Sequence, residues 1–587
     1  MRSIRFTYSL LMNCLQIDDF SLDLRNDEEW KSILHRISFS LKRGETLGIV
    51  GESGSGKSVT ALSVMRLLSP KISRIQSGKI LFTPASSEES SEPIDLLSLS
   101  EKEMRHIRGS KIGMIFQEPM TSLNPVLRCG EQIMEALKLH TSLTKQEAKQ
   151  RVIDLFNEVM LPRPEKIFAS YPHELSGGQK QRVMIAMAIS CNPDILIADE
   201  PTTALDVTVQ KGILELIQQL QREHGMSVIF ITHDLGVVAQ IADNVVVLFK
   251  GNVVEQGSVK EIFHHPKHPY TQGLIACRPS LDKRFEKLPT VADFLQAHEE
   301  GGKPLSFKEI KSDERKARHK KLYQGEPLIR IENLTKKYAL RREKLFARRE
   351  YVYALDHVSL DIYEGETLGL VGESGCGKTT LGRTLLRLIE PDEGKIFYRN
   401  QDITHIPQRQ MRKLRKDLQI ILQDPYSSLN QRLTIGDAIM EPMQVHHLFA
   451  NNAERRERAL ALLERVGMNE SHFYRYPHEF SGGQRQRISI ARALAVNPKF
   501  IICDESVSAL DVSVQAQVLN LLNELKHEFH FTYIFISHDL SVVKFMSDRM
   551  AVMQNGHVVE MNEADEVYLH PQTDYTRKLI DAIPRIE

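Results

Sequence analysis

Two glycine-rich stretches in this sequence have the residue types and the spacing needed to hold the phosphates of a nucleotide. They read GESGSGKS and GESGCGKT, and both fit the pattern G-x-x-x-x-G-K-[ST]. The glycines let backbone N–H groups surround the phosphates, the lysine reaches the β- and γ-phosphates, and the final hydroxyl binds Mg²⁺. The pattern predicts nucleotide contacts from Gly51, Ser53, Gly54, Gly56, Lys57 and Ser58, and from Gly372, Ser374, Gly375, Gly377, Lys378 and Thr379.

Each phosphate loop is matched by a pair of acids further along the chain. Asp199-Glu200 and Asp504-Glu505 end the apolar runs DILIADE and KFIICDE, which are typical of buried parallel strands with chemistry at their carboxyl ends. We expect Asp199 and Asp504 to hold Mg²⁺, directly or through water. We expect Glu200 and Glu505 to polarise the attacking water. One acid pair alone is more often a solvated turn, but its recurrence at a fixed distance from a second motif favours the functional interpretation.

The motifs recur because the chain is an internal repeat. Lys57 and Lys378 lie 321 positions apart, whereas His233 and His538 lie 305 positions apart, as do two S-G-G-Q motifs. Most of the difference falls in residues 83–95, a Ser/Glu-rich stretch that we interpret as a surface loop inserted after a strand. Both halves alternate apolar strands with amphipathic helices, which predicts α/β units on a largely parallel sheet.

Bulk properties narrow the class of protein. At 587 residues the chain is too long for one hydrophobic core, and its 76 basic residues equal its 76 acidic residues, so net charge gives no indication of nucleic acid binding. Six dispersed cysteines without a C-x-x-C pair argue against a zinc site and a disulfide framework, and favour a reduced, cytosolic chain. No apolar run reaches 18 residues, which predicts no membrane span. The N-terminal run lacks a signal-peptide cleavage site, and the first strand pattern leaves Met1 and Met12 as alternative starts.

With both S-G-G-Q motifs, each followed by a basic helix start, the two halves resemble the nucleotide-binding domains of ABC ATPases. The resemblance implies an α/β fold with two P-loop NTPase domains in tandem, each with a RecA-like core, an antiparallel β subdomain and a helical signature subdomain. It implies ATP and Mg²⁺ as cofactors. Further roles carried over from the family are the Q-loop glutamines near the γ-phosphate and Mg²⁺ (Gln117, Gln423), the signature residues (Ser176, Gly178, Gln179, Ser481, Gly483, Gln484), the D-loop aspartates (Asp206, Asp511) and the catalytic switch histidines (His233, His538).

In that family a signature loop binds the γ-phosphate on the opposite domain. The resemblance therefore implies that Ser481 and Gly483 complete the site of Lys57, and that Ser176 and Gly178 complete the site of Lys378. Two half-sites in one chain would then finish each other, with linkage raising the effective concentration of one half near the other.

Base recognition differs between the halves. The family usually stacks an aromatic side chain on adenine near the end of its first strand, and Tyr338 fits that position. Leu24 holds the same register in the first half, so adenine packs more loosely there or against another residue such as Phe20. The sequence SV after Glu505 replaces the usual Pro-Thr, which we regard as harmless. We expect both sites to hydrolyse ATP.

Residues 281–326 lose the α/β pattern. Their polar, basic composition predicts a solvated linker between domains 1–280 and 327–587, with contact to lipid headgroups as the minority interpretation. A second charged insert, residues 340–350, is interpreted as a hairpin tip.

The sequences beside the Q-loops, FQEPMTSLNPV and LQDPYSSLNQR, resemble the peptide/nickel branch of ABC importers, as do the tails HPKHPYTQGLIACRPS and HPQTDYTRKLI. This resemblance implies an ATPase that couples two composite sites to uptake of di- or oligopeptides. It implies two separate permease subunits, an extracytoplasmic solute-binding protein and a peripheral position on the cytoplasmic face of the inner membrane. Only Cys277 lies in the region where some relatives bind an iron–sulfur cluster, so we expect none. The cargo itself, whether peptide, glutathione-like solute or metal chelate, leaves no mark on this sequence.

Two other classes of soluble tandem ABC ATPase stay open at this point. Ribosome-acting ATPases share the motor and join their domains with a charged helical linker, for which residues 281–326 could be mistaken. The importer-like flanks and the neutral charge favour transport, because rRNA binding usually brings a basic excess. DNA-repair ABC proteins use zinc-binding cysteine pairs, which this sequence lacks.

Overall fold

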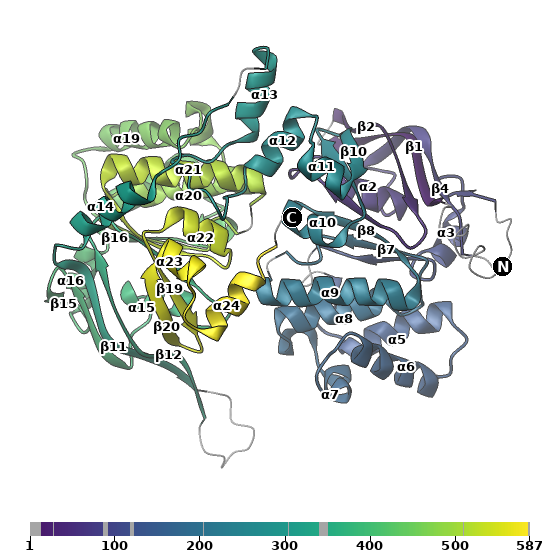
Figure 1. Cartoon of the computed structure of the whole chain (residues 1–587), viewed down its shortest axis with the longest axis horizontal. Coiled ribbons are helices and arrows are strands. Elements are labelled where there is room, and N and C mark those ends of the chain that lie inside the picture. Colours follow the sequence, from purple (N-terminus) through teal and green to yellow (C-terminus); the bar gives the residue numbers. More distant parts are fainter. Residues whose placement is uncertain are drawn as a thin grey trace.

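The computed structural model describes residues 13–26, 29–85, 92–117, 122–203, 205–302, 305–339, 350–508 and 510–584. The alternative starts at Met1 and Met12, most of the Ser/Glu-rich insert and the charged tip 340–349 lie outside these residues. Figure 1 shows two similar halves side by side, with the first half in purple and blue and the second in green and yellow. The tandem α/β architecture predicted from the sequence is confirmed.

Each half is built around a six-stranded sheet whose central strands are parallel. Their residues are apolar on both faces and buried, as expected for strands covered by helices on two sides. In the first half the order is β10-β9-β3-β8-β7-β6, with bounds β3 Thr46–Val50, β6 Ile112–Ile115, β7 Ile195–Asp199, β8 Ser227–Thr232, β9 Asn244–Phe249 and β10 Asn252–Ser258. In the second half the order is β16-β17-β18-β13-β19-β20, with bounds β13 Thr367–Val371, β16 Leu418–Ile421, β17 Phe500–Asp504, β18 Thr532–Ile536, β19 Arg549–Gln554 and β20 His557–Glu563.

A four-stranded antiparallel sheet flanks each core. Its strands are β1 Asn13–Asn26, β2 Glu29–Lys42, β4 Ser73–Phe82 and β5 Ile94–Asp95 in the first half, and β11 Pro327–Ala339, β12 Tyr351–Tyr363, β14 Glu393–Tyr398 and β15 Gln401–Asp402 in the second. Because Ala339 pairs with Tyr351, strands β11 and β12 form a hairpin around the charged insert, as predicted.

Helices cover the sheets and form a separate group before each S-G-G-Q helix. The first half contains α2 Lys57–Val64, α3 Glu101–Ile107, α5 Cys129–His140, α6 Lys145–Glu158, α7 Pro164–Ala169, α8 Gly177–Ile189, α9 Val207–His224, α10 Leu235–Ile241, α11 Val259–His264 and α12 Pro269–Ala276. The second contains α15 Lys378–Leu385, α16 Gln408–Leu414, α17 Pro425–Ser428, α18 Ile435–Val445, α19 Asn452–Arg465, α20 Gly482–Leu494, α21 Val512–Phe529, α22 Leu540–Met546, α23 Ala564–Leu569 and α24 Asp574–Asp581. No helix among the described residues is long and apolar enough to cross a bilayer.

The segment between the halves differs from the predicted solvated linker. We call residues 281–302 and 305–326 the strap. It contains α13 Val291–Glu299, which packs on α12 of the first half, and α14 Ser312–Leu322, which lies on the second half. Buried apolar residues continue from α10 and α12 through Leu288 and Val291 into the core of the second half. The basic composition is misleading because several of these charged side chains are paired at a protein surface.

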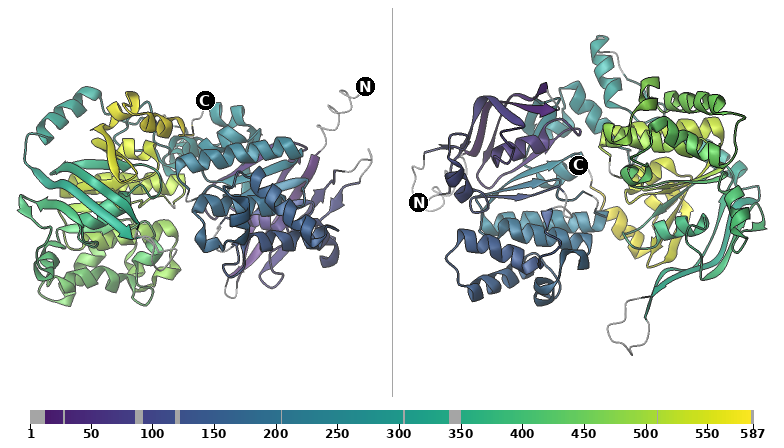
Figure 2. Two further views of the ribbon diagram at one scale, coloured as in Figure 1. Left: turned by 90° about the horizontal axis from the view of Figure 1, so that it is seen from below. Right: turned by 180° about the vertical axis from the view of Figure 1, so that it is seen from behind.

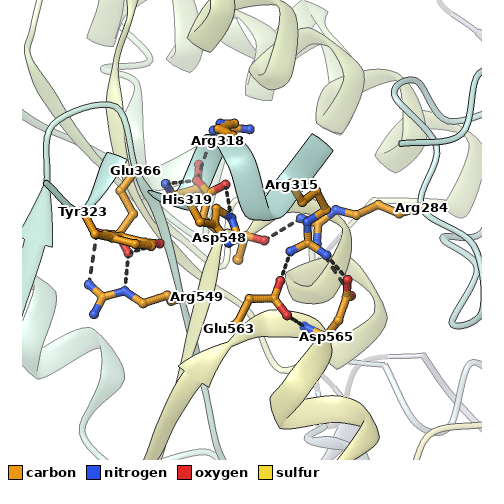
Figure 3. A network of polar contacts seen from close by, with 12 residues as sticks. Arg284, Arg315, Arg318, His319, Tyr323, Glu366, Asp548, Arg549, Glu563 and Asp565 are labelled. Carbon is orange, nitrogen blue, oxygen red and sulfur yellow. Dashed lines mark hydrogen bonds and ion pairs between the residues drawn. The ribbon is translucent and has the colours of Figure 1, made fainter. Parts of the chain in front are cut away.

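Figure 3 shows the polar contacts of the strap with the second half. Arg315 is only 8% exposed and pairs with Glu563 and Asp565. Arg318 and His319 approach the buried carboxylate of Asp548 to 3.2 and 3.3 Å. The Tyr323 hydroxyl donates to Glu366, and the Tyr323 ring faces Arg549. Arg284 donates to the backbone carbonyls of Phe545 and Ser547. The backbone N–H and carbonyl of Leu288 both form hydrogen bonds with the side-chain amide of Asn520.

Candidate ATP-binding sites

Both phosphate loops connect a buried strand to a helix N-terminus. In the first loop, Gly51, Gly54 and Gly56 adopt φ values of 153°, 77° and 105°, and a Cβ atom at Gly51 would lie 2.2 Å from the Leu248 carbonyl oxygen. Only glycine fits there. The second loop repeats these conformations at Gly372, Gly375 and Gly377.

The loop lysines lie inside the loops that carry them. The Lys57 ammonium donates to the carbonyls of Gly51 and Glu52 at 2.7 and 2.9 Å, and Lys378 donates to Gly372 and Glu373 at the same distances. Burial lowers the pKa of Lys57, although nearby carboxylates oppose this effect. The loops are therefore shaped to hold a cation close to bound phosphates.

The predicted Mg²⁺ ligands lie together in each half. The Ser58 hydroxyl donates to Asp199 at 3.1 Å, and Thr379 donates to Asp504 at 2.9 Å. Burial raises the pKa of Asp199 to about 6, and burial also raises that of Asp504. A hydroxyl and a buried carboxylate are the oxygen ligands that Mg²⁺ prefers, so these residues fit the ion.

The predicted catalytic glutamates are each held by the glutamine and histidine of their own half. Gln117 donates to Glu200 at 3.1 Å and the His233 ring nitrogen lies 3.2 Å from the same carboxylate. Gln423 donates to Glu505 at 2.7 Å, while His538 lies 3.8 Å away. A glutamine and a histidine from two distant parts of the sequence thus meet at one glutamate carboxylate in both halves.

The D-loops cross between the halves. Asp511 of the second half accepts a hydrogen bond from the Ser53 N–H of the first phosphate loop at 2.9 Å. A cavity of about 300 Å³ lies over the second phosphate loop. Its walls combine Thr203, Leu205 and Asp206 of the first half with Ser374, Gly375, Gly377, Lys378, Thr379, Thr380, Gln423, Glu505, Ser508 and His538 of the second.

The signature residues begin helices α8 and α20. Ser176 caps α8 and forms a reciprocal capping box with Gln179, and Ser481 does the same with Gln484. A Cβ atom at Gly178 would lie 2.9 Å from Val209 of its own half. Neither Ser176 nor Gly178 belongs to the walls of the 300 Å³ cavity, so the structure does not bring them into that site.

The residues considered for adenine have different environments. Tyr338 is 44% exposed, with the Lys336 ammonium 5.7 Å from its ring centre. Leu24 packs against the core of the first half. Phe20 is fully buried, so the proposal that it could supply adenine packing is wrong.

Several contacts around the phosphate loops were not predicted from the sequence. The Thr203 hydroxyl donates to Glu200 at 2.9 Å, and the Tyr270 hydroxyl accepts from the Glu52 N–H at 2.9 Å. Tyr575 makes the same contact with Glu373 at 3.0 Å. The repeat offered a signal, since Tyr270 and Tyr575 also lie 305 positions apart.

Comparisons with known proteins agree with this geometry. The model of the ABC transporter family matches residues 34–203 and 355–508, and that of the oligopeptide/dipeptide transporter C-terminal region matches residues 254–303 and 559–587. The first of these C-terminal matches runs past residue 280 into the strap.

Relatives named glutathione import ATP-binding protein GsiA, from Shigella sonnei (strain Ss046) and Escherichia coli (strain K12), are 48% identical over 580 residues. Each alignment covers 98% of this chain and 90% of the relative. A dimeric structure of the ATP-binding cassette MJ0796 bound to ADP and Pi is 32% identical, covers 40% of this chain and 98% of that chain, and has a TM-score of 0.37. The chain therefore belongs to the ABC transporter family, as a tandem ATPase of the peptide/nickel importer type whose ATP hydrolysis is coupled to transport.

Proposed function

We propose that this chain powers an importer in which two composite ATP sites drive uptake of glutathione or of di- and oligopeptides through separate permease subunits. The observation that carries the proposal is the recurrence of one set of lysine, hydroxyl, aspartate, glutamate, glutamine and histidine contacts in both halves. The C-terminal region of oligopeptide/dipeptide transporters follows each set. Glutathione is itself a tripeptide, so it belongs to the same chemical class as the other cargo.

The two halves act as a pair. The contact between Asp511 and the Ser53 N–H supports pairing, as do the first-half walls of the cavity over Lys378. In the proposed cycle, ATP favours a closed arrangement in which Ser481 and Gly483 meet the site of Lys57, and Ser176 and Gly178 meet the site of Lys378. Hydrolysis and product release then let the halves reopen.

Mg²⁺ would be held in the first site by Ser58, Asp199 and Gln117, and in the second by Thr379, Asp504 and Gln423. When bound, the ion neutralises charge on the β- and γ-phosphate oxygens. Glu200 and Glu505 orient the attacking water and take its proton, while His233 and His538 hold these carboxylates in place. Tyr338 stacks on adenine in the second site.

Permease subunits dock beside the Q-loops and place the chain at the cytoplasmic face of the membrane, with a solute-binding protein on the other side. A groove of about 890 Å³ in the first helical group is lined by Arg128, Lys149 and Phe168, among others. Exposed large apolar residues also occur in the Q-loops and helical groups; they are Phe116, Val126, Leu127, Leu139 and Leu143 in the first half, and Tyr426, Val445, Phe449, Tyr474 and Tyr476 in the second.

Uptake of radiolabelled glutathione and tripeptide by cells that lack this chain tests the proposal. We expect the wild-type chain to restore uptake and the double variant Lys57→Ala/Lys378→Ala to fail. Lys102→Ala, which changes an exposed lysine, serves as the control and should restore uptake fully. Equal uptake with and without the chain, for both solutes, would contradict the proposed cargo class.

A further inference from the structure

We propose that Glu52 and Glu373, the second residues of the two phosphate loops, are positioning residues that tie each loop to its own tail and to the opposite half. We call each of these contact sets a latch. The inference extends the proposed pairing of the halves and rests on it for its effect on ATP turnover. The latch itself consists of contacts that can be tested one by one.

All three polar groups of Glu373 are used by different elements. Its N–H donates to the Tyr575 hydroxyl at 3.0 Å, and its carbonyl accepts from the Lys378 ammonium at 2.9 Å. Its carboxylate accepts from the Thr208 hydroxyl of the first half, also at 2.9 Å. One residue therefore joins the tail of its own half, the phosphate-binding lysine and the start of the opposite D-loop helix.

Glu52 repeats this arrangement in the first half. Its N–H donates to Tyr270 at 2.9 Å, its carbonyl accepts from Lys57 at 2.9 Å, and its carboxylate accepts from the Ser513 hydroxyl of the second half. Thr208 and Ser513 occupy the same position in α9 and α21, and differ only by a methyl group. Two independent copies of the same three contacts argue that the arrangement is functional.

The tail tyrosine of the first half is held in place by its surroundings. Tyr270 is fully buried and stacks on Phe249 with ring centres 4.1 Å apart. Burial raises the pKa of Tyr270 and raises that of Tyr575 to about 12, so both hydroxyls stay protonated at physiological pH. Each can accept from a backbone N–H without becoming charged.

The latch connects the phosphate loop to events elsewhere. When the loop lysine moves onto bound phosphates, it breaks its hydrogen bond to the backbone carbonyl of Glu52 or Glu373. That glutamate then has one contact fewer to hold it in position. The same residue is held on one side by the tail and on the other by the opposite half. Loop position in one site therefore depends on how closely the other half approaches, which provides a route for cooperation between the sites.

A double-mutant cycle on the intact chain tests the latch of the second loop. The variants are Glu373→Ala, Thr208→Val and their combination, and the readouts are KM for ATP, kcat, the Hill coefficient and Tm. We expect each single change to raise KM about fivefold or more and to lower the Hill coefficient, with kcat changed much less. Thr208→Val also removes a hydrogen bond to Asp206 of the same half, whereas Glu373→Ala does not. The combination should therefore match Thr208→Val alone, because the contact with Glu373 is already lost in that variant.

Matched controls separate the contact from a general loss of structure. Glu373→Gln keeps an oxygen acceptor and Thr208→Ser keeps the hydroxyl found at Ser513, so both should restore wild-type KM. Glu364→Ala removes an exposed carboxylate that pairs with Arg399 of the same half, and should have no effect. Tyr575→Phe removes the hydroxyl that accepts from the Glu373 N–H. It should raise KM at unchanged Tm. This variant provides the test if Glu373→Ala does not fold.

Additive effects in the cycle, or a KM for Glu373→Ala equal to wild type, would overturn the latch. A KM rise in Glu373→Gln as large as that in Glu373→Ala would overturn it as well. If wild-type ATPase activity shows a Hill coefficient of 1, the proposed pairing is contradicted, while the KM cycle still decides whether the latch positions the loop.

Discussion

Glu200 and Glu505 share an unusual backbone conformation, with φ of 47° directly after the last residue of a buried strand. A non-glycine residue in this region is strained, and such strain concentrates at functional sites. Burial favours the neutral carboxyl, but the hydrogen bond and charge of His233, together with Thr203 and Lys57, lower the pKa of Glu200 to about 2. The pKa of Glu505 is lowered by His538 in the same way, again against burial. Both glutamates are thus ionised at neutral pH and able to accept a proton from water.

This equivalence predicts that both sites turn over. Glu200→Gln and Glu505→Gln should each lower kcat by about 100-fold or more, because the amide cannot accept the proton. ATP affinity should stay within a few fold of wild type. Steady-state ATPase assays and ATP-binding titrations of the two variants provide the measurement. Loss of turnover in only one of them would show that the sites are unequal.

The spacing of local motifs was sufficient to predict that Ser58 lies beside Asp199 and Thr379 beside Asp504, next to each phosphate loop. Gln117 and His233 were carried over from the family resemblance, and both lie at Glu200. The repeat aligns Tyr270 with Tyr575, but nothing in the sequence indicates that Tyr270 contacts Glu52, which lies 218 residues away. Contacts of that kind depend on tertiary packing.

At the scale of elements, the strap is the main difference between the two halves. Its contact surface on the second half has side chains that the first half lacks at the same repeat positions. Buried Asn520 and Phe545 correspond to Glu215 and Gln240, which are exposed. The sequence could not reveal this surface, because a polar residue on a helix is ordinarily solvated. The repeat thus provides a control position for each strap contact.

We expect Asn520→Glu to weaken the attachment of the strap. The change removes two hydrogen bonds to the backbone of Leu288 and places a charge against it, so the free energy of unfolding should fall by about 1–3 kcal/mol. Glu215→Asn in the first half should stay within about 0.5 kcal/mol of wild type. Calorimetry measures the loss in the free energy of unfolding, and hydrogen exchange shows whether the strap is the segment that loses protection. Equal effects of the two changes would contradict a dedicated strap surface.

The buried carboxylate of Asp548 provides a second test of strap attachment, with a larger expected change in the free energy of unfolding. Burial opposes its ionisation, but Lys526, His319 and Arg318 hold its pKa well below the ordinary 3.8. A lowered carboxyl pKa contributes stability that is present above pH 3.8 and is lost as the pH falls through the folded-state pKa. Asp548→Asn leaves buried cations unpaired and should cost about 3–5 kcal/mol at pH 7.

Asp243, the equivalent residue of the first half, accepts from the Thr46 N–H. Asp243→Asn should therefore cost only about 1 kcal/mol, because one hydrogen bond is weakened. Denaturant titrations at pH 7 and pH 3 measure both variants. A deficit of Asp548→Asn that is the same at both pH values would contradict the ionic account of strap attachment.

At the scale of the whole molecule, the strap, the tails and the D-loops join the halves at several places. Figure 2 shows the halves adjacent in two further views. Pro584, near the C-terminal end of the second half, lies against Gly236 of the first half, and the buried apolar cluster at Leu288 runs between the two halves. The repeat in the sequence predicted two similar domains. It did not predict how firmly they are joined, because the strap has no repeated counterpart and the contacts that do repeat, such as Thr208 with Glu373, form only on tertiary packing.

Identifying the proteins that bind the intact chain in its own cells tests directly whether the chain powers an importer. The tagged chain would be purified in a gentle detergent, and the bound proteins identified by mass spectrometry against an untagged control. We expect two polytopic permease subunits to co-purify with the chain in stoichiometric amounts. Ribosomal proteins without any permease would contradict this expectation, and would assign the same ATPase to translation.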